Sequence, residues 1–176
     1  MLNYDLTRGK KIRRIDDTAF KLDNLSSRCM FCHATPDNGF DVVWENDTYT
    51  VFKDNRPATV QHFQVIPKRH IESVKCLTKA DADMVREMEW IGHRVLEDLD
   101  VPASDRRLGF HVPPFNSVSH LHLHVQALPY KSSLMKLEFL LTPGRNGSDK
   151  GISWFADVGQ TVRILEKGGR VKVLSC

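Results

Sequence analysis

The sequence lacks any apolar stretch near the roughly 20 residues that a membrane-spanning helix requires. Its first residues, Met1 to Asp5, also lack the apolar core of a secretory signal. The net charge of +3 is too small to indicate a nucleic-acid partner, although it is compatible with a small anionic ligand. We therefore expect a protein of the cytoplasm or nucleus that has no membrane partner.

Cysteine is scarce, with four residues among 176. Two of them, Cys29 and Cys32, are separated by two residues, and in a chain that is not secreted this spacing indicates metal or redox chemistry before a structural disulfide. The spacing suits tetrahedral zinc, which needs two further nitrogen or sulfur ligands. A redox pair is the alternative, but no strand–helix–strand pattern surrounds it. Two unligated core cysteines are a third interpretation.

The chain is long enough for one domain with terminal segments to spare. Residues 1–27 carry little apolar periodicity, and five of the seven residues from Arg8 to Arg14 are basic. We predict a flexible N-terminal segment there, with a nuclear-import or phosphate-binding role as the alternative. A folded domain is expected over residues 28–130, followed by a C-terminal extension over 131–176 that packs on it.

Apolar periodicity predicts an α+β fold built on a five-stranded antiparallel sheet, one main helix and a C-terminal helical tail. The helix is expected over residues 78–100, begun by Thr78 with Asp81 three residues on. Its apolar stripe should face the sheet. The strands are expected at 41–45, 49–53, 62–66, 108–112 and 119–127, and a strand edge with a short helix at 154–165.

Three of the eight histidines alternate with apolar residues in the run His120-Leu121-His122-Leu123-His124. Successive side chains of an extended strand point to opposite faces, so the three imidazoles should share one face while the leucines pack on a core. Imidazole serves as a nucleophile, proton carrier or metal ligand. A half-buried strand with a chance polar face would favour Thr, Ser or Lys instead. The run therefore predicts a catalytic or metal site.

The histidine run and two upstream segments resemble the histidine-triad (HIT) family of nucleotide hydrolases and transferases. The upstream segments are His62 to His70 and Val51 to Asp54. The sequence is most similar to the Hint branch of nucleoside phosphoramidate hydrolases, in particular its third type, through segments 109–115, 119–124 and 153–155. The resemblance covers about residues 28–130 and implies the HIT fold.

The resemblance also implies catalytic roles. His122 matches the family's nucleophile, which attacks the α-phosphorus of a nucleotide and forms a nucleotidyl-histidine that water then cleaves. His124 and His62 match residues that contact phosphate oxygens, and Ser117 matches a serine that helps the leaving group. His111 ends the preceding strand, at the expected rim of the pocket. The chemistry needs no catalytic cofactor.

Binding roles follow in the same way. Asp54 matches a ribose-binding aspartate, and Met30, Phe31 and Phe52 match residues that sandwich the base of a purine nucleotide of the AMP type. Asn116, beside Ser117, is a further candidate for nucleotide binding. Some HIT proteins hold a structural zinc with two cysteines and two histidines, which by position are Cys29, Cys32, His70 and His120 here. Members of the family commonly form homodimers through the main helix and a sheet edge.

Three functions are consistent with these residues. The first is hydrolysis of the phosphorus–nitrogen bond of adenosine 5′-phosphoramidate and related nucleoside phosphoramidates. The second is removal of AMP from adenylated DNA ends, because the segments before His120 also resemble aprataxin. We do not expect the zinc-finger module of aprataxin here, since Cys176 is the single cysteine after Gln126 and no histidine follows His124. The third is nucleotide binding without catalysis, against which intact His122 and His124 argue. We expect the first.

Overall fold

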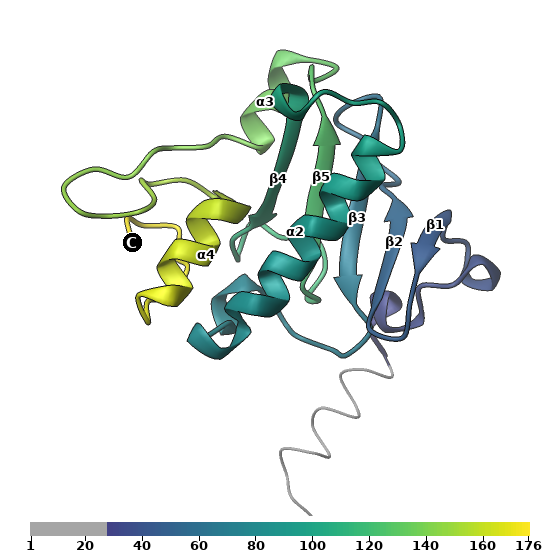
Figure 1. The fold of residues 1–176 in the computed structure, drawn as a ribbon, viewed down its shortest axis with the longest axis horizontal. Helices are drawn as coiled ribbons and strands as arrows, with labels where there is room; N and C mark the ends of the chain where they lie inside the picture. The colour runs from purple at the N-terminus through teal and green to yellow at the C-terminus, as the bar shows by residue number, and fades with distance from the viewer. Residues whose placement is uncertain (1–27) are drawn as a thin grey trace, which may run out of the picture.

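The computed structural model describes residues 28–176, so the basic run from Arg8 to Arg14 and the predicted flexible segment 1–27 lie outside the described residues. A single antiparallel sheet of six strands, in the order β1-β2-β3-β5-β4-β6, forms the centre of the fold (Figure 1). The strands are β1 Val42–Glu45, β2 Tyr49–Lys53, β3 His62–Pro67, β4 Arg106–His111, β5 Leu123–Ala127 and β6 Phe155–Asp157. The α+β class expected from the sequence is confirmed.

The expected count of five strands is wrong, because β6 adds a sixth at the edge next to β4. The strand edge and short helix expected at 154–165 are present as β6 and the following helix, but three residues are too few for an alternating pattern to show that β6 belongs to this sheet. Its position is decided by pairing, with Gly109, Phe110 and His111 of β4 opposite Asp157, Ala156 and Phe155. The C-terminal part of the chain therefore completes the sheet.

The histidine strand also begins later than expected, at Leu123 and not at Ser119. Its partner strand β3 ends at Pro67, which has no backbone N–H to continue the ladder. The N–H of Leu121 donates instead to the carbonyl of Ile71, at 2.6 Å. His120 and His122 thus precede the regular strand. The alternation of faces nevertheless persists, because Leu121 and Leu123 are buried in the main core.

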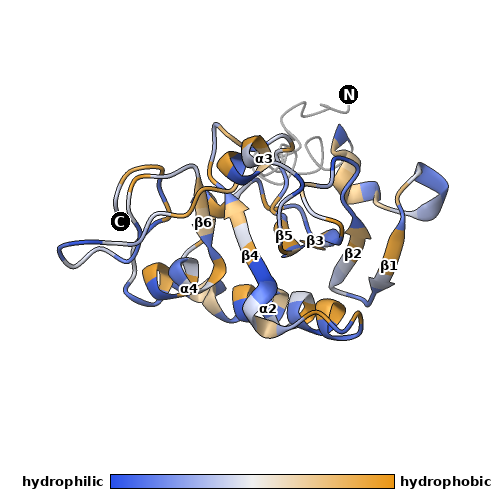
Figure 2. Ribbon diagram, turned by 90° about the horizontal axis from the view of Figure 1, so that it is seen from above, coloured by the Kyte–Doolittle hydropathy of each residue, from blue (hydrophilic) through white to orange (hydrophobic). Residues whose placement is uncertain are grey.

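Helix α2 (Ala82–Glu97) packs across one face of the sheet, with α4 (Val158–Glu166) beside it (Figures 1 and 2). The expected capping box is present, with Thr78 and Asp81 exchanging hydrogen bonds before a short 3-10 turn, Lys79–Asp81, leads into α2. The helix ends at Glu97, three residues before the expected end. Leu99 therefore leaves the apolar stripe and is exposed.

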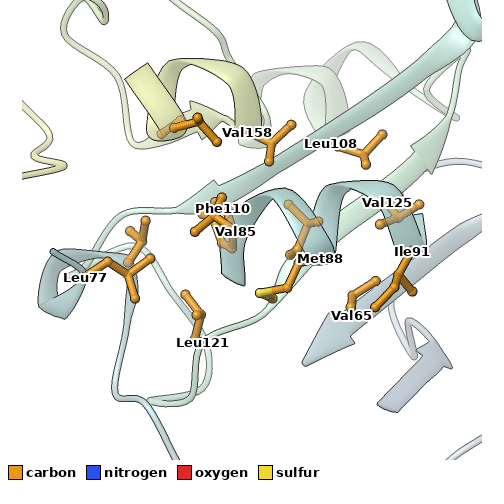
Figure 3. Close-up of a cluster of buried hydrophobic side chains, with 14 of the residues drawn as sticks. Val65, Leu77, Val85, Met88, Ile91, Leu108, Phe110, Leu121, Val125 and Val158 are labelled. Atoms are coloured by element: carbon orange, nitrogen blue, oxygen red, sulfur yellow. The ribbon is translucent and has the colours of Figure 1, made fainter. Parts of the chain in front are cut away.

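The main core lies between α2 and the sheet (Figure 3). Val85, Met88 and Ile91 of the helix meet side chains from β3, β4 and β5. At Gly92 an added Cβ would lie 2.7 Å from Val125 and 2.8 Å from Leu108, so glycine permits close contact between helix and sheet. Among residues 28–176, no helix is long and apolar enough to cross a membrane.

Helix α3 (Ser133–Glu138) lies on the side of the sheet opposite α2 (Figure 2). Trp154 Nε1 donates to the carbonyls of Leu137 and Glu138, at the C-terminal end of α3. Phe139, just after the helix, packs with Phe155 and Ala58 in a small apolar cluster. This cluster borders the sheet face that carries the histidines, because the Phe139 ring contacts the rings of His62 and His124.

Candidate active site

The histidines of the run are all buried, with His120, His122 and His124 between 1% and 5% exposed. His122 and His124 share the sheet face away from α2, and their ring centroids are 5.0 Å apart. His62 joins them from the neighbouring strand β3, with its Nε2 3.0 Å from Nδ1 of His124. The structure thus brings together the three histidines to which the sequence assigned catalytic roles.

The hydrogen bond of His122 defines its tautomer. Its Nδ1 lies 2.6 Å from the backbone carbonyl of His120. A carbonyl oxygen only accepts, so Nδ1 carries the proton and, in the neutral ring, Nε2 keeps a lone pair. Burial lowers the pKa of His122 below its ordinary value, which favours this neutral form. The neutral ring therefore has a lone pair on Nε2 that can act as a nucleophile.

A chain of hydrogen bonds links His62, His124 and His111. Nδ1 of His62 accepts from the backbone N–H of Ala58, so its Nε2 carries the proton and donates to Nδ1 of His124. Nε2 of His124 then donates to Nδ1 of His111, at 3.1 Å. The amide of Gln126 lies 3.3 Å from His62 Nε2, which makes His124 the nearer partner. Every proton in the chain therefore has one defined place.

The chain of hydrogen bonds between the histidines ends at helix α3. Nε2 of His111 donates to the carbonyl of Glu138, the last residue of α3, at 2.9 Å. The sequence placed His111 at the pocket rim, whereas the structure makes it a member of the histidine cluster. No local pattern indicated this, because the contact depends on the pairing of β4 with β5 and on the position of α3.

Burial keeps the three imidazoles of this chain neutral. It lowers the pKa of His62 to about 4, with the nearby Asp54 carboxylate opposing the shift. It also lowers the pKa of His111, and it lowers that of His124 well below the ordinary value, with the neighbouring histidines adding to the effect. At neutral pH these three hydrogen-bonded imidazoles are therefore uncharged.

Asp54 lies at the edge of the cluster, just beyond the end of β2. One carboxylate oxygen, Oδ1, accepts from the backbone N–H of Arg56 at 2.7 Å, and the other, Oδ2, accepts from Gln64 Nε2 at 2.7 Å. The second oxygen is also 3.4 Å from His62 Nε2 and 3.6 Å from His124 Nδ1. Asp54, His62 and His124 are close enough together to hold a cation, but here these nitrogens already take part in the histidine chain.

An aromatic wall borders His122. Phe31 contacts the ring of His122 edge-on, with centroids 5.5 Å apart, and packs against Phe52 at 5.2 Å. Both phenylalanines belong to a second apolar cluster with Ala34 and Ile66. Met30 lies outside this cluster and is 53% exposed. It lines a surface cavity of about 480 Å³ with His33, Asn38 and Phe40.

The loop between β4 and the histidine run carries the two other predicted residues. Asn116 is half-buried, and its side chain donates to the carbonyl of Val118. Ser117 is exposed, and within residues 28–176 its hydroxyl makes no hydrogen bond to the histidines. The structure thus places both residues in the loop before His120, and within residues 28–176 neither side chain makes a hydrogen bond to the histidine cluster.

Cys29, Cys32, His70 and His120 converge from three separate segments of the chain. Their ligand atoms all lie within 4.8 Å of one another. The Sγ···Nδ1 distances are 3.4 Å for Cys29 to His120, 3.5 Å for Cys32 to His120 and 3.3 Å for Cys32 to His70. Zinc bonds of about 2.3 Å to sulfur and about 2.0 Å to nitrogen, at a tetrahedral angle, separate such atoms by about 3.5 Å. The four residues therefore fit a zinc ion.

His120 has the tautomer that this site requires. Its Nε2 donates to the carbonyl of Pro67 at 2.9 Å, which leaves Nδ1 unprotonated and directed at the two sulfurs. Burial and the neighbouring Cys29 raise the pKa of Cys32 to about 12. Its thiolate is therefore disfavoured at neutral pH unless a cation is bound.

The antiparallel sheet, the helix across its back and the buried histidines on its front define a histidine-triad fold. A model of the family described as "Scavenger mRNA decapping enzyme C-term binding" matches residues 28–139. A HIT family hydrolase from Clostridium thermocellum superimposes with a TM-score of 0.54 at 26% identity, covering 60% of this chain and 94% of that one. The chain belongs to the HIT family.

The similar proteins include two HINT3 proteins and an aprataxin. Adenosine 5′-monophosphoramidase HINT3 of Xenopus tropicalis is 41% identical over 102 residues, which cover 56% of this chain and 67% of the relative. The HINT3 protein of Danio rerio is 37% identical over 149 residues, or 83% and 87% of the two chains. Aprataxin of Danio rerio is 27% identical over 132 residues, which are 74% of this chain and 38% of that protein.

Proposed function

We propose that this protein is a hydrolase that cleaves the phosphorus–nitrogen bond of adenosine 5′-phosphoramidate and related nucleoside phosphoramidates. The relatives named as adenosine 5′-monophosphoramidases support this activity, at 37% and 41% identity. The observation that carries the proposal is the hydrogen bond from His122 Nδ1 to the carbonyl of His120. It directs an unprotonated Nε2 away from the backbone and keeps the ring in one orientation.

In the first step, Nε2 of His122 attacks the α-phosphorus while the phosphorus–nitrogen bond breaks. The amine leaves with the bonding electrons and takes up one proton, for which we propose the hydroxyl of Ser117 or solvent as the source. In the second step, water attacks the phosphorus of the nucleotidyl-histidine, the bond from phosphorus to His122 Nε2 breaks, and its electron pair returns to Nε2. The hydroxyl of the water stays on phosphorus, and its other proton returns to Ser117 or solvent in place of the one taken by the amine. The carbonyl of His120 stabilises the positive charge that His122 carries in between.

His62 and His124 supply N–H groups beside the reacting phosphorus. We propose that they donate to phosphoryl oxygens, where negative charge grows in the transition state. The chain through His111 fixes these protons on Nε2 of both rings before substrate arrives. Without substrate these N–H groups donate to His124 and His111, so donation to the phosphoryl oxygens requires that each N–H share or exchange its present acceptor.

The nucleoside is assigned to the adjoining region. Asp54 would accept from the ribose hydroxyls, and Phe31 and Phe52 would contact the purine through their apolar surfaces. Exposed Met30 and half-buried Asn116 would reach the nucleotide only from the rim. With these assignments, His122 lies between the aromatic wall proposed to hold the base and the histidines proposed to hold the phosphate. A nucleophile that attacks the α-phosphorus must occupy such a position.

Removal of AMP from adenylated DNA ends is the second candidate. The identity of 27% to an aprataxin favours it, although this chain spans only 38% of that protein. Both reactions use the same nucleophile and differ in the leaving group, which is an amine in one and a DNA 5′-phosphate in the other. Similarity at the catalytic histidines is therefore expected for both reactions, and the substrate distinguishes them.

Turnover of two substrates by the same preparation tests the proposal. A fluorogenic AMP phosphoramidate should be hydrolysed, and a nicked, 5′-adenylated DNA duplex should be processed at least about a hundredfold less efficiently in kcat/KM, a difference of about 2.7 kcal/mol in the barrier. The reverse preference would assign the chain to DNA repair. A protein that binds AMP and turns over neither substrate would be a nucleotide-binding protein without catalysis.

We also propose a structural zinc ion held by Cys29, Cys32, His70 and His120. The fit of the sulfur–nitrogen distances and the tautomer of His120 support it. A closed set of four ligands has no open position, so such an ion would stabilise the fold and take no part in the reaction. His120 would then serve both the metal, through its ring, and the nucleophile, through its carbonyl.

A homodimer is the proposed assembly. Trp90 on α2 is 61% exposed, and Val43 and Trp44 on the edge strand β1 are partly exposed as well. Large apolar side chains on a helix and on a sheet edge are features of subunit interfaces. Association would remove these side chains from water.

A further inference from the structure

Gln64 has a buried side-chain oxygen with no partner. Within residues 28–176, its Oε1 is the one fully buried side-chain oxygen or nitrogen that makes no hydrogen bond. The residue as a whole is only 7% exposed. Leaving a buried acceptor unpaired is costly in a folded protein, so such an atom calls for an explanation in the function of the site.

The orientation of the Gln64 amide is fixed by its neighbour. Nε2 donates to Asp54 Oδ2 at 2.7 Å, and a carboxylate oxygen accepts hydrogen bonds and does not donate them. Turning the amide over would place two oxygen acceptors against each other. Oε1 is therefore the atom directed away from Asp54, and its lack of a partner is not an exchange of nitrogen and oxygen.

Gln64 lies on the sheet face that carries the site. On β3 its neighbours Phe63 and Val65 point into the main core, so Gln64 points to the opposite face with His62. Its cross-strand partners are Phe52 on β2 and His124 on β5. The amide thus stands between the aromatic wall and the histidine cluster, next to the carboxylate assigned to ribose.

We infer that Gln64 is a specificity-determining residue, whose Oε1 accepts a hydrogen bond from one hydroxyl of the substrate ribose while Asp54 accepts from the other. The inference rests on the proposed function. Two adjacent hydroxyls of a ribose are two donors side by side, and an amide oxygen beside a carboxylate gives two acceptors side by side. The Asp54 oxygens each accept one hydrogen bond from the protein and have a further lone pair available.

This arrangement selects ribonucleotides over deoxyribonucleotides. A nucleotide that lacks the hydroxyl facing Gln64 leaves Oε1 buried and unpaired, and sites built to bind a hydroxyl reject analogues without it strongly. An apolar side chain at position 64 would impose no such penalty. The position therefore controls the class of sugar accepted and makes no contribution to bond cleavage.

Binding measurements by titration calorimetry test the inference with AMP, 2′-deoxy-AMP and 3′-deoxy-AMP as probes. For the wild-type protein we expect each deoxynucleotide to bind about ten- to a hundredfold more weakly than AMP. In Gln64→Met, one of the two ratios should fall to within about threefold, while the other is retained through Asp54. Met has nearly the same length as Gln but no donor, and its sulfur is only a weak acceptor.

Gln160→Met provides the matched control. Gln160 is about as buried as Gln64, but its Oε1 accepts from the backbone N–H of Asp157 and its Nε2 donates to the carbonyl of Thr142. This variant should keep both wild-type ratios. Gln64→Leu serves as a second substitution, with folding checked by thermal unfolding.

Two outcomes would overturn the inference: equal binding of all three nucleotides by the wild-type protein, or unchanged ratios in both Gln64 variants. The proposed function fails separately. Discrimination between sugars without turnover of a phosphoramidate would disprove the enzyme and keep Gln64 as a ribose contact. Turnover without discrimination would do the opposite.

Discussion

Nδ1 of His111 lies 3.1 Å from Nε2 of His124, although the two residues are on different strands and thirteen positions apart. Because His111 in turn donates to the carbonyl of Glu138, its Nδ1 is an acceptor and His124 must be the donor. A residue outside the histidine run thus decides which nitrogen of His124 carries the proton. The site extends beyond the run to β4 and to the end of α3.

Replacement of the nucleophile should abolish turnover and spare binding. His122→Asn and His122→Ala remove bond formation to phosphorus, whereas Asp54 and the aromatic wall supply affinity for the nucleotide. We expect kcat to fall at least about a thousandfold and the Kd of AMP to change by less than about fivefold. A variant that kept a tenth of wild-type activity, a difference of about 1.4 kcal/mol in the barrier, would contradict the role of His122.

Loss of the His111 ring nitrogens should reduce catalysis through His124. In His111→Phe the Nε2–H of His124 has no acceptor, so the proton is no longer confined to one nitrogen. We expect kcat to drop by about ten- to a hundredfold, with little change in the Kd of AMP. The pH profile of kcat should shift as well.

Trp154→Phe is the control for His111→Phe. It removes the other side-chain hydrogen bond to the Glu138 carbonyl and leaves the histidine chain intact. If the two variants lost equal activity, the contact to α3 and not the placement of the proton would be the cause.

The buried histidines should make the protein less stable in acid. The pKa of His62 is about 4 in the folded protein and about 6.5 in the unfolded chain, so between these values the unfolded state binds more protons. The free energy of unfolding therefore falls as the pH falls from about 7 to about 4, with His62 alone contributing about 3 kcal/mol. His111 and His124, whose pKa values are also lowered, act in the same direction.

Urea unfolding at several pH values measures this effect. The His62→Gln variant should show a shallower decline with acid, while His33→Gln, at an exposed position, should follow the wild type. Stability that stayed constant or rose on acidification would show that these rings are not kept neutral by burial.

Metal content tests the cysteine–histidine cluster. Purified protein should contain about one zinc per chain, and Cys29→Ser should lower both the zinc content and the melting temperature. Cys76→Ser, at an exposed cysteine outside the cluster, should change neither. A metal-free protein whose Cys29 and Cys32 react freely with a thiol reagent would rule the zinc site out.

Light scattering tests the homodimer. At micromolar concentration the wild-type mass should be twice that of the chain, and Trp90→Glu should shift the population toward the monomer. Ile152→Glu introduces the same charge at a similarly exposed residue away from α2 and should have no effect. A monomeric wild-type protein would contradict the proposed assembly.

The sequence by itself determined the features that depend on neighbours along the chain. The two-residue period of the run from His120 to His124 assigned imidazoles to one face and leucines to the other, because side chains alternate on any extended backbone. The capping box of Thr78 and Asp81 predicted the turn that leads into the main helix, which itself begins at Ala82, because its hydrogen bonds join residues three apart.

Only the tertiary structure decided which distant residues complete the site. Gln64 stands beside Asp54 and His111 beside His124 because β3, β5 and β4 pair in one particular register, and no local period encodes that register. Strand β6 joined the sheet for the same reason, since the free edge of β4 and not its own short sequence defines it as a strand. Local pattern fixed which face a side chain takes, and pairing between strands fixed its neighbours.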